Sequence, residues 1–243
     1  MLVETALPAG DPSRYFGKGE KLVDRGPNRQ LTVPAVPLMY LRIMPAGETA
    51  PLKRADALDL IRGGPLRLDP FYCRDTGSGF EPNEYGAISV SANYTDGQIL
   101  SAAQLFLDRQ IWAFNATLLN PDAGRQKGIP TLSVEQTFAI CLPKYLMFAR
   151  DKLGLEPPFT IEAGAAGLKG YPIFMPNNYI EREWGPIQQN NIRWSGVLAA
   201  SDAASIDTAL LAIFDEFFDA GGVRRPAGLY KFPGTPAGVI PQG

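Results

Sequence analysis

The sequence predicts an α+β fold in which a mainly antiparallel sheet, including a three-stranded meander, carries two longer helices and one short helix. Three strand patterns follow one another between residues 85 and 119, separated only by tight turns. Residues 202–220 show one long amphipathic helix pattern. The predicted elements also lack the regular strand–helix–strand alternation of parallel sheets, which favours the α+β class.

The two ends of the chain differ in composition from its centre. Residues 1–37 are rich in proline, glycine and charge and show neither a strand nor a helix period, so we predict an extended arm. Residues 38–222 contain the periodic segments and are expected to form a single domain. Residues 223–243 are again rich in proline and glycine and are predicted to be a tail.

The domain is predicted to begin with a strand and a short helix. Leu38–Met44 is a nearly continuous apolar run, which is typical of a buried strand, and Pro45 and Gly47 end it. Arg54–Arg62 has apolar residues at helical spacing and is followed by two glycines, so a short helix is expected there. Residues 66–83 show no period and are predicted to be a loop.

The meander is the clearest sheet region of the chain. Tyr85–Tyr94 leads into the turn 95–97, which contains an Asp-Gly pair typical of a type I′ hairpin. The return strand is Gln98–Leu107, and a second turn at Asp108–Arg109 leads into the third strand, Gln110–Leu119. We therefore expect three antiparallel strands joined by two short turns.

A long helix is predicted after the polar connection 121–130. Ser133 and Gln136 have the spacing of a capping box, apolar residues recur at helical spacing up to residue 153, and Gly154 supplies a stop. Pro143 lies inside this pattern. Because proline lacks an N–H and clashes with the preceding turn, we expect it to kink the helix or split it in two.

The last third of the domain is predicted to contain three strands and a helix. Phe159–Gly164 and Gly170–Pro176 are expected to pair with each other through the turn 165–169, and Ile192–Ala199 is expected to be a further strand. Asp202–Ala220 then forms the long helix named above, which two glycines end.

Composition excludes several kinds of catalytic site. The 243 residues include no histidine, which removes Ser-His-Asp and Cys-His nucleophilic sites and histidine metal sites. Cys73 and Cys141 have no metal-binding or disulfide spacing and are expected to be inert. We find no nucleotide-binding loop or serine-nucleophile motif, and so predict no catalytic residue, no metal and no cofactor.

Charge and hydrophobicity bear on the partners and the compartment. A net charge of −2 does not predict a strongly electrostatic grip on nucleic acid, although a local basic surface remains open. Residues 1–20 do not resemble a signal peptide, and no apolar run is long enough to span a membrane. We therefore expect a cytoplasmic protein with no membrane contact.

Three stretches resemble a known family. They are Tyr85–Ser89, Ser101–Ala113 and Pro157–Tyr171, and in this order they are similar to the region that follows the Schlafen-type AlbA domain in many bacterial putative DNA-binding or ATP-binding proteins. The chain departs at residues 108–110, Asp-Arg-Gln, where the family tends to have Arg-Asn-Gly. Nothing before residue 38 resembles the AlbA-type domain itself. The resemblance implies an accessory domain and does not carry DNA binding or catalysis over to this chain.

Two groups of residues are candidate sites. The first is a glycine–lysine turn with aromatic residues after it, in which backbone N–H groups and one ammonium could approach an anionic ligand. Its members are Gly167, Lys169, Gly170, Tyr171, Trp184 and Trp194. The alternative, which the residue types favour, is a tight β connection with a solvated lysine and core aromatics. The second group is basic, Arg224, Arg225 and Lys231, and could contact nucleic acid or remain solvated.

Three functions follow as hypotheses. The first is a non-catalytic accessory domain of a cytoplasmic bacterial nucleic-acid-associated system, which binds a protein partner, a second copy of itself, a small ligand or an AlbA-type domain. The second is a hydrolase or nuclease in which converging carboxylates hold a divalent ion. The third is direct nucleic-acid binding through a contiguous face of lysine and arginine.

Overall fold

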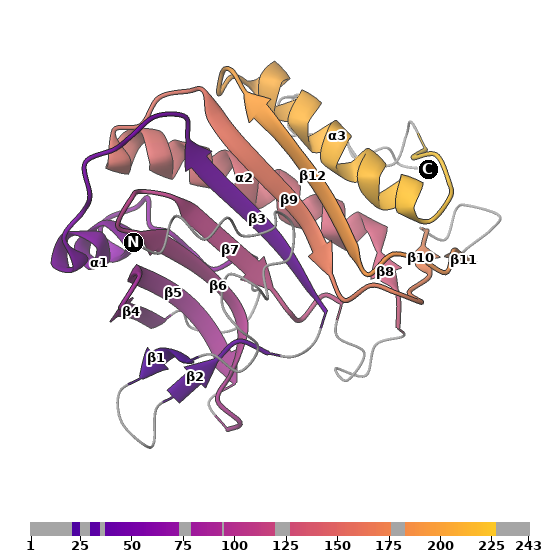
Figure 1. Cartoon of the computed structure of the whole chain (residues 1–243), viewed down its shortest axis with the longest axis horizontal. Coiled ribbons are helices and arrows are strands. Elements are labelled where there is room, and N and C mark those ends of the chain that lie inside the picture. The colour runs from indigo at the N-terminus through magenta and orange to yellow at the C-terminus, as the bar shows by residue number, and fades with distance from the viewer. Residues whose placement is uncertain are drawn as a thin grey trace.

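The computed structural model describes residues 21–24, 30–34, 37–72, 79–93, 95–119, 127–175 and 183–226. These residues form a nine-stranded sheet, a smaller three-stranded sheet and three helices (Figure 1). Nearly all strand pairs of the large sheet are antiparallel, and only β2 and β6 run parallel. The prediction of an α+β fold with a mainly antiparallel sheet is confirmed.

The described elements alternate between sheet and helix along the chain. The strands of the large sheet are β1 (Lys21–Asp24), β2 (Gln30–Thr32), β3 (Leu38–Pro45), β4 (Gly79–Asn83), β5 (Gly86–Asn93), β6 (Gln98–Phe106), β7 (Ile111–Asn115), β9 (Phe159–Ala166) and β12 (Asn191–Leu198). The small sheet contains β8 (Ile129–Pro130), β10 (Ile173–Phe174) and β11 (Glu183–Trp184). The helices are α1 (Arg54–Arg62), α2 (Thr131–Leu153) and α3 (Ala203–Ala220).

The meander β5–β6–β7 is confirmed and forms one half of the large sheet. From β7 the sheet continues through β3 and β9 to β12, so the central strand β3 lies between β7 and β9. On the other side of β6 the sheet continues through β5 to β4, while β2 joins β6 next to its start and carries β1. The strand β12 therefore ends the sheet on one side (Figure 1).

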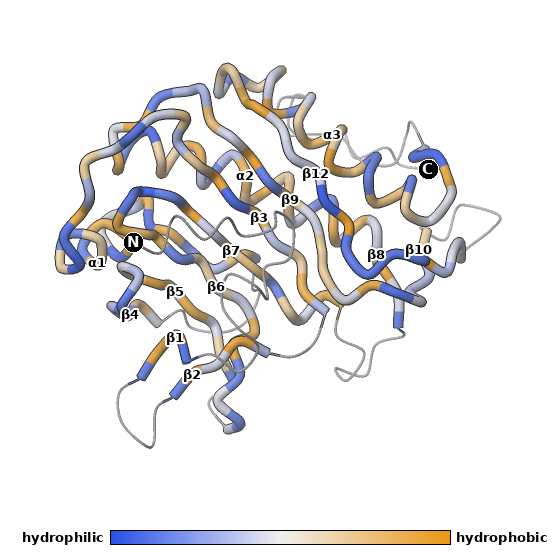
Figure 2. The backbone as a smooth tube through the Cα atoms, in the orientation of Figure 1, coloured by the Kyte–Doolittle hydropathy of each residue, from blue (hydrophilic) through white to orange (hydrophobic). Residues whose placement is uncertain are grey.

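The sheet has a hydrophobic core on each face. On one face, Met39, Leu41 and Ile43 of β3 pack in a large cluster with residues of all three helices, such as Phe138 of α2. On the other face, a smaller cluster contains Tyr40 together with residues of the β1–β2 hairpin and of the meander. Hydrophobic segments accordingly recur along the strands and in α3 (Figure 2). Alternation along one strand thus supplies both cores.

The second half of the predicted arm is structured, which corrects the boundary at residue 38. The strands β1 and β2 pair with each other, and Thr32 of β2 pairs with Gln98 of β6. Leu22 and Leu31 are buried at 1% and 2% exposure. Strands this short are stabilised only by the surface on which they pack, so their local sequence does not reveal them. Residues 1–20 of the predicted arm lie outside the described residues.

Other local differences have identifiable causes. The strand β4 lies in the predicted loop, where its short segment pairs with β5. Helix α2 begins at Thr131 after Pro130, so Ser133 and Gln136 lie inside the helix and form no capping box. The helix is one element through Pro143, with apolar residues on both sides of the proline buried in the same core. The proline removes one intrahelical hydrogen bond, which this packing outweighs.

The predicted pairing of 159–164 with 170–176 is wrong. The strand β9 pairs with β3 on one side and with β12 on the other. The second segment supplies only β10, which pairs with β8 and β11 in the small sheet. Because β3 comes from far earlier in the chain, the local sequence pattern does not reveal that it pairs with β9. Helix α3 does follow the prediction, with Asp202 as its N-cap accepting from the Ser205 N–H.

The turn at residues 95–97 is also of another type than predicted. Gly97 has a positive φ of 69°, but no positive φ occurs at Asp96. Because a type I′ turn requires positive φ at both central residues, this connection is a longer loop. The Asp96 carboxylate stabilises it by accepting hydrogen bonds from the Gln98 N–H and the Asn93 amide.

A buried ion pair joins the end of the described chain to α2. The Arg225 guanidinium donates to both carboxylate oxygens of Glu135, at 2.7 and 2.8 Å, and the two side chains are 5% and 2% exposed. The same guanidinium lies 5.6 Å from the centre of the Phe214 ring of α3. Burial raises the pKa of Glu135, and the hydrogen bonds from Arg225 oppose that rise.

Removing Arg225 should destabilise the protein in a pH-dependent way. Arg225→Ala leaves a buried carboxylate without its cation, so we expect a loss of about 3–5 kcal/mol at neutral pH. Without Arg225 the rise in the pKa of Glu135 is unopposed, and a carboxyl with a raised folded pKa destabilises the fold only when it is ionised. The loss should therefore shrink as the pH falls through that pKa.

Urea denaturation of both proteins between about pH 7.5 and about pH 4.5 measures this effect. Arg224→Ala is the matched control, because Arg224 is the neighbouring arginine and is exposed. We expect that control to change stability by less than about 0.5 kcal/mol at each pH. A loss in Arg225→Ala that grows on acidification would contradict the role given to Glu135.

Candidate functional site

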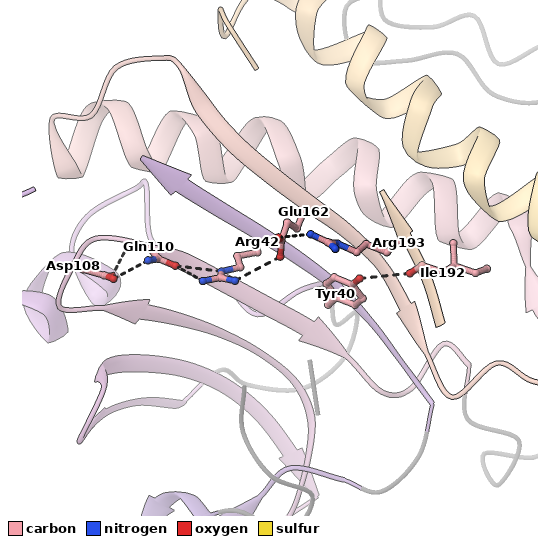
Figure 3. Close-up of polar contacts among 7 residues, drawn as sticks. All are labelled: Tyr40, Arg42, Asp108, Gln110, Glu162, Ile192 and Arg193. Atoms are coloured by element: carbon pink, nitrogen blue, oxygen red, sulfur yellow. Dashed lines mark hydrogen bonds and ion pairs between the residues drawn. The ribbon is translucent and has the colours of Figure 1, made fainter. Parts of the chain in front are cut away.

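The polar feature that stands out on the large sheet is a row of five side chains on the face opposite the helices (Figure 3). We call it the charge ladder; its members are Asp108, Gln110, Arg42, Glu162 and Arg193. Gln110 donates to Asp108 at 2.7 Å and accepts from Arg42 at 2.7 Å. Arg42 approaches one oxygen of Glu162 at 3.5 Å, and Arg193 donates to the other at 2.9 Å.

Strand register brings the ladder together. Arg42 lies directly opposite Glu162 in the β3–β9 pair, and Glu162 lies opposite Ser195 in the β9–β12 pair. Arg193 lies opposite Gly164, two pairs away, and reaches diagonally to Glu162. Residues two positions apart on a strand share a face, so all these side chains emerge on one side. The ladder therefore crosses from the β6–β7 turn to the outer strand β12.

Gly164 gives the ladder the space it needs. A Cβ atom at this position would lie 2.0 Å from the Ile192 carbonyl oxygen and 3.0 Å from the Tyr40 hydroxyl. In the absence of a side chain, the Tyr40 hydroxyl donates to that carbonyl at 3.5 Å. A larger residue at position 164 would push β12 away from β9.

The ladder is shielded near its centre and opens toward β12. The side chains of Arg42 and Glu162 are 15% and 11% exposed, whereas that of Arg193 is 38% exposed. Both oxygens of Glu162 are engaged by guanidinium groups, so this carboxylate acts as a hydrogen-bond acceptor that holds two cations. The arrangement orders β3, β9 and β12 and leaves its Arg193 end partly exposed.

The outer strand β12 is the most accessible part of this face. Arg193, Ser195 and Val197 are exposed along it, whereas Ile192 and Leu198 are buried. Val197 is 69% exposed, more than any other large hydrophobic residue in the described part of the chain. A polar ladder that ends beside an exposed valine combines orientation and apolar contact, as binding surfaces do.

The turn between β6 and β7 contains residues 108–110. Arg109 has a positive φ of 66°, a conformation in which glycine or asparagine is more usual. Its guanidinium donates to the carbonyl oxygens of Ala50 and Leu153, which ties the turn to α2. Asp108 and Gln110 meanwhile belong to the charge ladder. The three residues are thus used for structure and for the ladder.

The predicted glycine–lysine turn leads from β9 toward the small sheet and does not join two paired strands. Gly167 and Gly170 have φ values of 80° and 82°, which explains the glycines. The N–H groups of Leu168 and Gly170 donate to the carbonyls of Asn190 and Ile187, and that of Tyr171 donates to the carbonyl of Leu168. These three N–H groups are therefore already used within the fold.

The side chains of this candidate group differ in their exposure to solvent. Lys169 is exposed, whereas Tyr171 is only 4% exposed and belongs to the large core. The Lys127 ammonium lies 4.8 Å from the centre of the Tyr171 ring. Trp184 of β11 and Trp194 of β12 are partly buried and pack against the same core. The two tryptophans lie on strands of separate sheets.

The predicted basic group is divided as well. Arg225 is held in the buried pair with Glu135, so its guanidinium is not available to a phosphate. Arg224 is exposed. Lys231 lies outside the described residues. A contiguous basic face is therefore not formed by the two arginines together.

Within the described ranges, no group of three or more aspartate, glutamate or cysteine residues could hold a metal ion. Helices of the described chain are also too short or too polar to cross a membrane. A groove of about 220 Å³ lies between α2 and the start of α3, with Pro143, Met147, Ala203 and Ile206 among the residues that line it. It is lined mainly by apolar side chains.

Comparison with known proteins found no relative of this chain. No family model, curated protein or solved structure matches it.

The sequence contained a signal for the ladder that the prediction missed. Arg42 stands in the otherwise apolar run Leu38–Met44, and Glu162 stands in the strand that begins at Phe159. Charges within buried strands are costly unless they are paired. Two opposite charges in two such strands therefore point to each other. What the sequence did not reveal is that β3 and β9 are neighbours.

Removing the central carboxylate should destabilise the sheet. Glu162→Ala leaves Arg42 and Arg193 without their shared acceptor in a shielded position, so we expect a loss of about 1–3 kcal/mol in the free energy of unfolding. Asp151→Ala is the matched control, because Asp151 pairs with Arg150 on an exposed surface. That pair should contribute less than about 1 kcal/mol. Equal losses in the two variants would contradict the role given to Glu162.

Cys141 should be unreactive in the folded protein. It is 4% exposed, and burial raises the pKa of its thiol to about 12. Because the thiolate is the nucleophile, alkylation by iodoacetamide at neutral pH should be negligible until the chain unfolds. Mass spectrometry of a Cys73→Ser variant, with and without denaturant, isolates Cys141. Rapid labelling of the native variant would contradict this expectation.

Proposed function

We propose that this chain is a non-catalytic binding domain that recognises a protein partner through the outer strand β12 and the charge ladder beside it. The observation that carries the proposal is the composition of this surface. Arg193, Ser195 and Val197 are exposed side by side on one strand face, and Val197 is 69% exposed. An apolar contact beside a fixed charge suits a protein interface.

The contacts of Glu162, Glu135 and Cys141 support a structural role for these three residues. Glu162 holds two arginines, Glu135 holds Arg225, and burial raises the pKa of the Cys141 thiol. Each of these groups is committed to packing or to an ion pair. A partner would therefore meet a preformed surface, which reduces the entropy lost on binding.

The biological setting is part of the same proposal. The motifs at residues 85–89, 101–113 and 157–171 are similar to the region after the Schlafen-type AlbA domain, and on this ground we place the chain in a nucleic-acid-associated system of that type. The partner in such a setting would be another protein of the system or a second copy of the chain. Direct nucleic-acid contact is less favoured, because Arg225 is engaged inside the fold.

Site-specific photo-cross-linking tests the binding surface. A photo-reactive phenylalanine analogue is placed at Val197, and the protein is irradiated in the cells that produce it. Leu132 is the matched control position, because it is an exposed hydrophobic residue on α2, at 38% exposure. We expect a discrete protein adduct from position 197 and none from position 132.

Two outcomes would contradict the proposed function. One is the absence of any protein adduct at position 197. The other is a thermal shift produced by Mg²⁺, Mn²⁺ or nucleotides, or a retarded oligonucleotide at low salt, since a ligand that binds the native state raises its apparent stability. The thermal-shift and retardation assays use the full chain and are repeated with the Val197→Lys variant for comparison.

A further inference from the structure

The last described residues follow the interface between α2 and α3. After the two glycines that end α3, the Val223 N–H donates to the Phe218 carbonyl oxygen at 3.1 Å. The Arg225 guanidinium lies over the Phe214 ring, one turn nearer to the start of α3, and donates to Glu135 of α2. Residues 223–225 therefore run back along α3 and are fastened between the two helices.

The apolar groove lies further along the same interface. The two helices are antiparallel here, because Phe138 near the start of α2 contacts Phe214 and Phe217 near the end of α3. The groove has a volume of about 220 Å³ and lies where residues 143–150 of α2 meet residues 201–206. At the rise of an α-helix, this is roughly 12–18 Å beyond the site where Arg225 is held.

The chain beyond Pro226 is long enough to reach the groove. An extended chain advances at most about 3.3–3.6 Å per residue, so about four to seven residues after Arg225 cover the distance. The residues at that place in the sequence are Leu229, Tyr230, Lys231 and Phe232, which lie outside the described residues. A mainly apolar segment thus follows directly on the residues that are directed toward an apolar groove.

We propose that Tyr230 and Phe232 fill this groove within the same chain and thereby close the α2–α3 interface. In an extended segment, residues two positions apart point to the same side, so the two aromatic rings enter together and Lys231 points to solvent. The opposite arrangement would bring the Lys231 ammonium to a groove that Arg150 lines, and like charges repel each other. Pro233 favours the extended conformation at Phe232.

The tether explains why this segment, and not one from another molecule, is the occupant. Arg225 is held by its buried pair with Glu135, only a few residues before the segment, so the local concentration of the segment at the groove is high. A second copy or another protein would lose translational and rotational freedom on binding there. An external peptide with two aromatic residues two positions apart would have to displace the chain's own segment.

Photo-cross-linking within the purified full chain tests this docking. A photo-reactive phenylalanine analogue replaces Met147, which lines the groove and is 45% exposed, and peptide mass spectrometry locates the adduct. We expect adducts at residues 229–233. A mixture of isotopically labelled and unlabelled chains shows whether both parts of an adduct come from one chain. Val197, exposed on the face of the sheet opposite the helices, is the control position and should give no adduct with this segment.

A variant of the segment provides the second measurement. Phe232→Asp should lower the yield of the adduct at position 147 by about tenfold or more, because a carboxylate would have to enter an apolar site. In the otherwise unmodified chain it should also lower the melting temperature by a few degrees. Thr235→Asp is the matched control, since it introduces the same charge three residues later, and it should leave both quantities unchanged.

Three results would overturn the inference. They are the absence of an adduct between position 147 and residues 229–233, an adduct that joins two different chains, and a yield and melting temperature that Phe232→Asp leaves unchanged. None of these results bears on the proposed function, because α2 and α3 cover the face of the sheet opposite the charge ladder.

Discussion

The central strand β3 is the constraint on which the rest of the large sheet depends. Its alternating residues divide between the two faces: Met39, Leu41 and Ile43 enter the core under the helices, and Tyr40 enters the core under the β1–β2 hairpin. Arg42 shares the face of Tyr40 and meets Glu162. A slip of one residue would bury the guanidinium of Arg42 among the helices and move Met39, Leu41 and Ile43 to the opposite face. The charge ladder therefore specifies the register of β3 against β9 and also stabilises the sheet.

Two ion pairs of different character fix the ends of this arrangement. Glu135 and Arg225 are almost fully buried and fasten the end of the described chain across α2 and α3. Glu162 instead bridges a shielded arginine and a more exposed one. Burying the first pair costs desolvation energy, which offsets much of its attraction. Its main consequence is that the Arg225 side chain has one position, because Glu135 would otherwise be a buried charge without a partner. The second leaves one guanidinium partly in solvent, where it can still take part in recognition.

The sequence predicted elements whose ends are defined locally. Helix α1 has the predicted bounds because glycines follow Arg62, and α3 fills its predicted range, with Asp202 as the N-cap. The prediction from sequence failed where a strand's pairing depends on a segment that is distant in the chain. The hairpin β1–β2 is held by β6 and β4, and the pairing of β9 with β3 joins segments more than a hundred residues apart. Arg42 and Glu162 could be recognised as charges in buried strands, but only the strand order shows that they meet.

The ladder and the outer strand β12 are linked through Arg193. A lone arginine on an outer strand would normally extend into solvent and discourage the approach of another strand. Here Glu162 accepts a hydrogen bond from it at 2.9 Å, and Arg42 on the far side of Glu162 keeps that carboxylate in place. The charge of Arg193 is thereby paired within the sheet, and Val197 remains exposed beside it. Because Asp108 and Gln110 position Arg42 in turn, the β6–β7 turn influences the outer strand β12, which lies three strands from β7. The same contacts that order the sheet thus also determine what its last strand presents.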